Sequence, residues 1–208
     1  MGDGDSPPDQ LCGSAADHRL SHPDAAGGGR VTQPPLSLWQ RLDARDRALF
    51  VRWVLSEFTP VRSTRLWRAL THLGGLRCAV ASTLLPLVAT GGAVRSAARE
   101  ALIALVVSHL VVQIVKRAVM RRRPTDGERA GAFVDVPDCF SFPSGHACAS
   151  MSVAFVYGLR FPVLAVPLVA LASIVGFSRV RLGVHYPGDV LVGQAIAILT
   201  VALLRSAA

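Results

Sequence analysis

Apolar residues are concentrated in five blocks of the chain, and polar or turn-forming residues separate these blocks. They cover residues 69–90, 97–115, 146–159, 162–177 and 188–204. A helix that spans a bilayer needs about 20 residues, so the shorter blocks must extend into their polar flanks. Strand-like alternation of apolar and polar positions does not occur along the sequence. The pattern predicts an all-α fold, a polytopic membrane helix bundle with about five spanning helices.

The N-terminal part of the chain lacks such blocks. Residues 1–36 are rich in Gly, Pro, Asp and Ser without apolar periodicity, which predicts a disordered tail and not a signal peptide. Residues 37–64 mix Arg and Asp with Trp, Leu and Phe at helical spacing, which predicts an amphipathic interfacial helix. Arg52 and Glu57 would make a span over residues 47–64 costly, and this alternative stays open. Residues 65–208 then form the membrane domain.

Composition agrees with this division of the chain. The 208 residues are 51% hydrophobic and 17% charged, with a net charge of +8 and a mean hydropathy of +0.41. In a polytopic apolar protein, an excess of basic residues usually binds lipid headgroups and sets the orientation of the protein in the membrane. We therefore expect the partner to be a membrane and not a nucleic acid. The protein is predicted to be an integral, multi-pass protein of the cell membrane. The four Cys residues have no spacing typical of a metal site or a disulfide framework, which favours structural roles.

Three polar motifs stand where apolar blocks begin or end. The first is KRAVMRRRP, residues 116–124, directly after the second block. Lys116 and Arg123 are seven residues apart, which is two helical turns, so they would share one face of a continuing helix. Such a pair is either a basic cap that reaches the headgroups or part of a phosphate site.

The second motif is P-S-G-H, residues 143–146, at the start of the third block. Free backbone N–H groups at a helix N-terminus attract anions. Ser144 would add a hydroxyl donor, and Gly145 would allow close approach to the backbone. His146 could then donate a proton to a leaving oxygen. The alternative is a simple N-cap serine followed by an uninvolved histidine.

The third motif lies within SRVRLGVHYPGDV, residues 178–190. Arg179 can bind phosphate through two N–H groups. His185 and Asp189 can meet across a helical turn or across a turn at Pro187, and the carboxylate would then fix the imidazole tautomer. The alternatives are an ordinary helix-capping contact or a metal site, although the neighbouring guanidinium groups would repel a cation.

The three motifs together, K-x6-R-P, P-S-G-H and S-R-x5-H-x3-D in this order, resemble those of the type 2 phosphatidic acid phosphatase superfamily. The resemblance covers roughly residues 70–204 and implies a metal-independent lipid phosphatase without a cofactor. It implies that His185 attacks phosphorus, that Asp189 orients His185, and that His146 protonates the leaving group and then activates water. The residues implied to hold the phosphoryl oxygens are Lys116, Arg123, Ser144, Gly145 and Arg179. Because His146 and His185 need opposite proton states, a bell-shaped pH profile follows.

The substrate stays open at this level. The resemblance implies a lipid phosphate, either an isoprenoid (polyprenyl) phosphate or diphosphate or a glycerolipid phosphate. Alternatives are a phosphotransferase of the same superfamily, a vanadate-dependent oxidase and a non-catalytic lipid-phosphate binder. The loop 124–142 could cover the headgroup or merely connect helices. Positive charges in the N-terminal segment predict a cytoplasmic active face, whereas many bacterial relatives have an outward-facing site. The oligomeric state is also left open.

Overall fold

The fold is helical throughout the part of the chain that can be described. The computed structural model describes residues 37–56, 58–124, 133–134 and 138–207. Within these ranges, the only extended pairing is an isolated β-bridge between Arg122 and Phe140. The predicted all-α class is therefore confirmed. The predicted tail 1–36 and most of the loop 124–142 lie outside the described residues.

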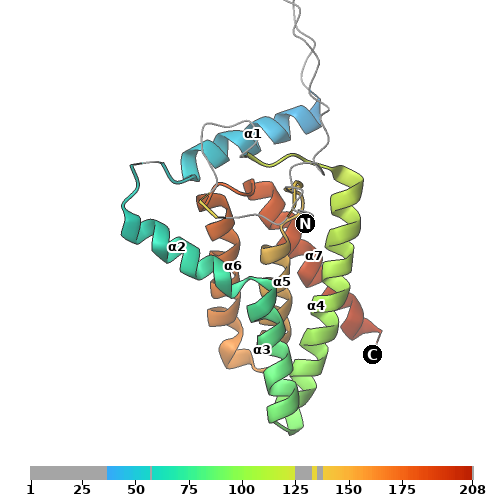
Figure 1. Cartoon of the computed structure of the whole chain (residues 1–208). Coiled ribbons are helices and arrows are strands. Elements are labelled where there is room, and N and C mark those ends of the chain that lie inside the picture. Colours follow the sequence, from blue (N-terminus) through green and yellow to red (C-terminus); the bar gives the residue numbers. More distant parts are fainter. Residues whose placement is uncertain (1–36, 57, 125–132, 135–137, 208) are drawn as a thin grey trace, which may run out of the picture.

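Five of the helices form the bundle, and two precede it. Helices α3 to α7 run alternately down and up (Figure 1), and α5 lies among them in contact with α3, α4, α6 and α7. Helices α1 and α2 lie at the end of the bundle where α4 finishes and α5 begins. The elements are α1 Leu38–Trp53, α2 Val61–Leu73, α3 Leu76–Ala89, α4 Gly92–Val119, α5 Gly145–Arg160, the 3₁₀ turn η3 Pro162–Leu164, α6 Ala165–Arg181 and α7 Pro187–Ser206.

The apolar blocks of the sequence correspond to the bundle helices. By length and composition, three described helical segments can cross a membrane, namely α4, η3 with α6, and α7. Helices α2 and α3 can form a fourth span with a bend of 46°. The first predicted block is thus broken at Gly74 and Gly75, and α5 has only 16 residues, which is about 24 Å of helix. The protein is an integral, multi-pass membrane protein with three or four candidate spans by this measure, where about five were predicted.

Helix α1 is shorter than the predicted interfacial segment 37–64. It begins with a capping box in which Ser37 and Gln40 bond each other's backbone N–H groups, and it ends at Trp53. It lies across the end of the bundle in Figure 1 and contacts α6 and α7. Phe50 is the buried side chain of α1, and its ring packs edge-on against Tyr186 at a centroid distance of 5.3 Å. The position of α1 in a membrane interface stays a prediction.

Small residues fill the contacts between the bundle helices. Close helix packing in membranes depends on such residues, because lipid tails provide no hydrophobic driving force. The Ser108 and Ser152 hydroxyls join α4 to α5 through a buried hydrogen bond of 2.8 Å. Buried alanines surround this bond along the same helices, namely Ala97, Ala98, Ala101 and Ala104 of α4 and Ala147, Ala149 and Ala154 of α5.

The cysteines differ from the expectation in one respect. Cys78 and Cys148 are free thiols, and Cys148 is buried on α5. Cys139 is disulfide-bonded, although the spacing of the cysteines gave no sign of a disulfide.

Gly193 allows α7 to approach the start of α5. A Cβ atom at Gly193 would lie 2.5 Å from the backbone oxygen of Ser144, and a backbone atom cannot rotate away. The N–H of Ser144 also donates to the backbone oxygen of Asp189 at 2.9 Å. The contact therefore fixes Ser144 against the first turns of α7.

We expect Gly193→Ala to destabilise the protein by about 1–3 kcal/mol, the usual cost of forcing an extra methyl group into a packed contact. Gly91→Ala is the matched control, because a Cβ there meets nothing within 4 Å. Thermal unfolding of the two variants in the same detergent measures the difference. Equal melting temperatures would contradict the close approach of α7 to Ser144.

Candidate active site

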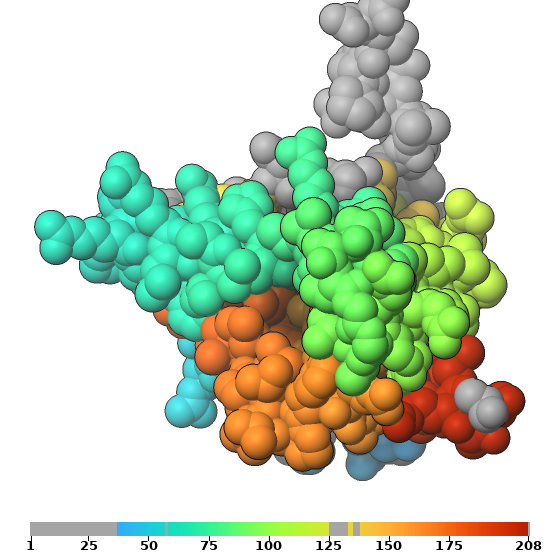
Figure 2. All heavy atoms as spheres, turned by 90° about the horizontal axis from the view of Figure 1, so that it is seen from below, coloured from blue at the N-terminus to red at the C-terminus, as the bar shows by residue number. Residues whose placement is uncertain are grey.

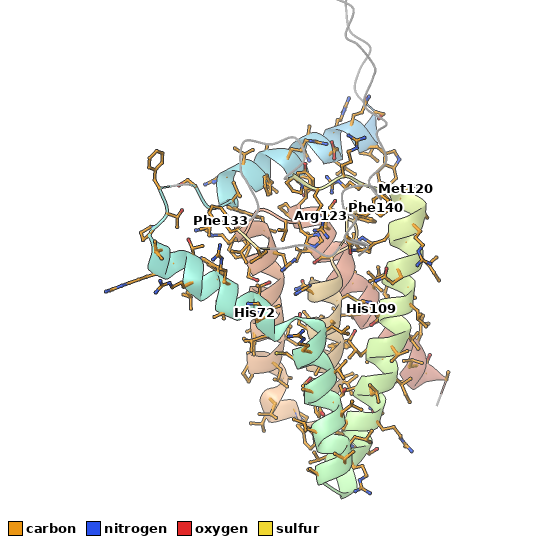
Figure 3. All side chains as sticks on the ribbon, in the orientation of Figure 1. His72, His109, Met120, Arg123, Phe133 and Phe140 are labelled. Atoms are coloured by element: carbon orange, nitrogen blue, oxygen red, sulfur yellow. The ribbon has the colours of Figure 1, made fainter. Side chains whose placement is uncertain are left out.

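The three motifs meet at one end of the bundle, although long segments separate them in the sequence. Lys116 lies near the end of α4, Gly145 begins α5, Arg179 lies near the end of α6, and Asp189 lies in the first turn of α7. Figure 3 shows Arg123 at this end, beneath α1. His146, of the second motif, lies within electrostatic range of Lys116 and Arg123 of the first motif and of Arg179 and His185 of the third. The structure therefore brings the predicted residues into one cluster.

Lys116 and Arg123 meet on a shared carboxylate and not on one helix face. Helix α4 ends at Val119, and Met120 adopts a left-handed conformation with φ of 48°, so the two-turn argument from the sequence is wrong. Both side chains nonetheless reach Asp138. The Lys116 ammonium donates to Asp138 Oδ2 at 2.8 Å, and Arg123 Nη2 donates to Asp138 Oδ1 at 2.6 Å. Arg123 Nη1 also donates to the backbone oxygen of Val184 at 2.8 Å.

Asp138 is the counter-charge of these two buried cations. Burial alone would raise the pKa of Asp138, but the hydrogen bonds and charges of Lys116 and Arg123 outweigh it and lower this pKa. The carboxylate is therefore ionised at neutral pH and occupies the donors that a phosphoryl group would need. A bound phosphoryl group must share or replace these contacts.

The start of α5 leaves its donors available. Ser144 is fully buried and is the N-cap residue of α5, yet its hydroxyl makes no capping hydrogen bond. A Cβ atom at Gly145 would meet no atom closer than 4.0 Å, where His109 and Val112 lie. Packing of the described residues therefore does not require glycine at this position. This open space is compatible with the close approach of an anion that the sequence predicts.

Three motif residues carry buried polar atoms without a hydrogen-bond partner among the described residues. These atoms are Ser144 Oγ, Arg179 Nε and His185 Nδ1. An unsatisfied buried polar group costs about 1–3 kcal/mol, so three of them at one site need an explanation. The Arg179 guanidinium group is held at another nitrogen, because Nη1 donates to the buried Thr71 hydroxyl at 2.8 Å. Ser144 Oγ and Arg179 Nε can donate to an anionic ligand, whereas His185 Nδ1 faces Asp189 Oδ2 at 3.6 Å.

His185 and Asp189 flank the start of α7. His185 precedes Pro187, and Asp189 Oδ2 accepts from the backbone N–H of Tyr186 at 2.8 Å, so the carboxylate also caps the helix. His185 Nδ1 lies 3.6 Å from Asp189 Oδ2, which is beyond hydrogen-bond range. Catalytic hydrogen bonds are often long without a substrate and shorten when one binds. His185 Nε2 lies 3.4 Å from Arg123 Nη1, among the cations.

His185 is held in its neutral form. Its side chain is buried, and burial is the main cause that lowers its pKa well below the usual value. The charges of Arg123, Arg179 and Lys116 lower this pKa further, against a hydrogen bond to the Ser141 backbone that raises it. A neutral imidazole keeps one nitrogen lone pair, which a nucleophile requires.

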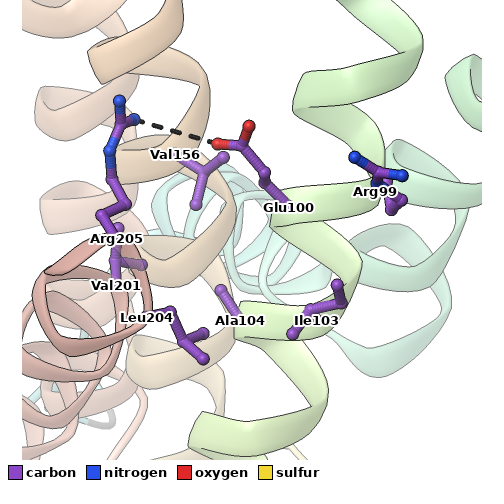
Figure 4. Close-up of a pocket in the computed structure, with 8 residues that line it drawn as sticks. All are labelled: Arg99, Glu100, Ile103, Ala104, Val156, Val201, Leu204 and Arg205. Atoms are coloured by element: carbon purple, nitrogen blue, oxygen red, sulfur yellow. Dashed lines mark ion pairs between the residues drawn. The ribbon is translucent and has the colours of Figure 1, made fainter. Parts of the chain in front are cut away.

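Two pockets differ in their chemistry. One of about 480 Å³ lies near the start of α4 and the end of α7, away from the motifs, where Arg205 and Glu100 form an ion pair at 3.9 Å (Figure 4). The other, of about 410 Å³, opens beside the motif cluster and contains two of its residues. It is lined by Arg68, Thr71, His72, Phe133, Val134, His146 and Arg179. The second pocket is therefore the entrance to the candidate site.

Metal ligation has no support among the described residues, where no group of three His, Cys, Asp or Glu side chains is placed to hold an ion. A metal-independent reaction stays a prediction. Two residues of the site belong to none of the three motifs, namely Thr71, which holds Arg179, and Asp138. Nothing in the local sequence marks Thr71. Asp138 carried a weak signal, because it is an acidic residue shortly before P-S-G-H.

Several known proteins are similar to this chain in sequence or in fold. Decaprenylphosphoryl-5-phosphoribose phosphatase of Mycobacterium tuberculosis is 40% identical over 104 residues, which cover 48% of this chain and 55% of that protein. Lipid A 1-phosphatase of Rhizobium johnstonii is 38% identical over 96 residues, covering 44% of this chain and 39% of that protein. The match thus spans about half the length, or less, of these curated relatives.

A solved structure has the same architecture. The transmembrane PAP2 type phosphatidylglycerolphosphate phosphatase of Bacillus subtilis aligns with a TM-score of 0.61 at 24% identity, covering 80% of this chain and 85% of that one. At this identity the likeness shows the fold alone. The family model of the PAP2 superfamily matches residues 97–207, more than half of the chain and all three motifs. The chain therefore belongs to the PAP2 superfamily.

Proposed function

We propose that this protein is an integral membrane lipid phosphatase that acts through a phosphohistidine. Its substrate would be an isoprenoid (polyprenyl) phosphate or diphosphate, or a glycerolipid phosphate. The observation that carries the proposal is the pair of orphaned buried donors on Ser144 and Arg179, next to the cations of the first motif and to His185 Nε2. A phosphoryl group supplies the oxygens that these donors lack, together with the negative charge that the cluster needs.

The first step transfers the phosphoryl group to His185. The Nε2 lone pair attacks phosphorus while the bond between phosphorus and the ester oxygen breaks on the opposite side. Burial, and then the charge of Arg179, lower the pKa of His146 to about 3, so the negative charge of the bound phosphoryl group must raise this pKa before His146 donates a proton to the departing oxygen. Lys116, Arg123 and Arg179 offset the negative charge that would repel the nucleophile, and Asp189 stabilises the positive charge that forms on His185.

The second step releases phosphate. His146, now neutral, accepts a proton from water while the water oxygen attacks phosphorus. The bond between phosphorus and Nε2 of His185 breaks, and the imidazole regains its lone pair. Inorganic phosphate leaves through the pocket lined by Arg68 and His72.

An apolar groove suits the hydrophobic part of such a substrate. It has a volume of about 260 Å³ and lies between α3, α5 and α6, with Leu168, Leu171 and Val175 on one side and Ala79 on the other. Figure 2 shows a hollow in the surface where the green and orange helices meet. A Cβ atom at Gly74 would touch both Val175 and the His146 backbone, so the groove and the phosphate site are neighbours. A lipid chain in the groove would place its phosphate at the motif cluster.

We expect detergent-solubilised protein to release phosphate in EDTA from at least one lipid of a defined panel. The panel contains a polyprenyl diphosphate, a polyprenyl monophosphate, phosphatidate and phosphatidylglycerophosphate. His185→Ala should abolish release, because the nucleophile is lost. Release that His185→Ala retains, or no release from any lipid, would refute the proposal. Product analysis with an added lipid or sugar acceptor separates hydrolysis from transfer.

Gly145→Ala should lower kcat/KM by about 100- to 1,000-fold, the range for losing one preorganised oxyanion donor, because the methyl group keeps the phosphoryl oxygens away from the backbone N–H. The added methyl group obstructs the ligand and not the protein, since the nearest protein atoms lie 4.0 Å away. The melting temperature should therefore remain that of the wild type. Full activity of this variant would contradict close approach of phosphate to the α5 N-terminus.

The acid limb of the kcat/KM profile should fall below pH 6.5. Only neutral His185 attacks, and its lowered pKa keeps it neutral as the pH falls through the ordinary histidine range. Two substrates whose phosphates have different pKa values distinguish enzyme ionisation from substrate ionisation. A limb at or above pH 6.5 that both substrates share would contradict the lowered pKa of His185.

A further inference from the structure

Arg121 connects the catalytic carboxylate to helix α1. It lies between the first-motif residues Lys116 and Arg123 and is not one of the motif positions. Its Nη1 donates to Asp189 Oδ1 at 2.7 Å and to Asp46 Oδ2 at 2.8 Å. Its Nη2 donates to Asp43 Oδ1 at 2.7 Å. One guanidinium group therefore bridges α7 and the N-terminal helix.

Arg121 supplies the counter-charge of Asp189. The Asp189 side chain has no exposed surface, and Arg121 is 18% exposed. Asp189 Oδ2 is directed to the Tyr186 N–H and toward His185, so Oδ1 is the oxygen that Arg121 holds. Two separate contacts on two oxygens fix the plane of the carboxylate. Without the guanidinium, a buried anion would have to move or take up a proton, and it could no longer stabilise a positive His185.

Helix α1 holds Arg121 in this position. Asp46 uses its second oxygen to accept from the backbone N–H of Gly188 at 2.7 Å, one residue before Asp189. The Arg121 guanidinium also stacks over the Tyr186 ring at 4.1 Å. Burial alone would lower the pKa of Arg121, but Asp189 and Asp46 raise it, so the group stays charged. The Arg121 guanidinium group therefore contacts α1, the Tyr186 ring and α7.

We propose that Arg121 is a positioning residue for the His185–Asp189 pair, and that α1 completes the active site by holding Arg121 through Asp46. The inference rests on the proposed phosphatase function. It assigns a role in the reaction to a helix that precedes the residues of the family match. Arg121 orients Asp189 and does not touch the substrate itself.

The test compares Arg121→Gln, Arg121→Lys and Asp46→Asn in the full-length protein, with Arg122→Gln as the matched control. Arg122 is the adjacent, exposed arginine. The assay uses the panel lipid that the wild type hydrolyses fastest. Arg121→Gln should lower kcat about 10- to 100-fold, as expected for loss of a hydrogen bond to a charged group, with KM changed less than about threefold. The kcat of Arg121→Lys should lie between those of the wild type and Arg121→Gln. Asp46→Asn should lower kcat less than Arg121→Gln does, and Arg122→Gln should have the kcat of the wild type.

A double variant distinguishes positioning from stability. In an Asp189→Asn background, Arg121→Gln should lower kcat by less than about threefold further, since both changes disable one unit. Independent, multiplying losses would assign Arg121 a merely structural role and overturn the inference. If Arg121→Gln does not fold, Asp46→Asn decides, and wild-type kcat in that variant overturns the role of α1. An inactive wild type refutes the phosphatase function, whereas an active wild type with an equally active Arg121→Gln refutes this inference alone.

Discussion

Mutual repulsion among buried cations is the constraint on which this site depends. Lys116, Arg123 and Arg179 lie at one end of an apolar bundle, where water screens their charges poorly. Asp138 compensates two of them through its two oxygens, and Thr71 takes one arm of Arg179. The charge that remains, together with the unsatisfied donors, is what the proposed phosphoryl group would neutralise and satisfy.

The bundle meets this constraint through small residues at the helix contacts. Gly193 allows α7 to reach Ser144, and Gly74 allows the α2–α3 junction to reach His146. These two close approaches bring α7 and the α2–α3 junction against the start of α5. A larger residue at Gly193 would move α7, with Asp189, away from Ser144, and one at Gly74 would displace His146. The helix packing therefore determines the geometry of the candidate site.

Local patterns in the sequence predicted the helices and the three motifs, because hydropathy and short spacings are readable within one segment. They failed where contacts join distant segments. The sequence does not indicate that α4 ends at Val119, since nothing before Arg121 breaks the helical pattern. Asp138 lies 22 positions from Lys116, and Asp46 lies 75 positions from Arg121. Such pairings follow from the tertiary arrangement, which no local spacing encodes.

The Asp138 carboxylate also sets a threshold of selectivity. Most headgroups of a bilayer are phosphodiesters with one negative charge on the phosphate, and they vastly outnumber any lipid with a terminal phosphate. A singly charged group gains little when it displaces an equally charged carboxylate from Lys116 and Arg123. A terminal phosphate carries close to two charges near neutral pH and gains more from the same exchange. With the proposed phosphatase function, Asp138 would therefore favour terminal phosphates over the phosphodiesters of the surrounding membrane.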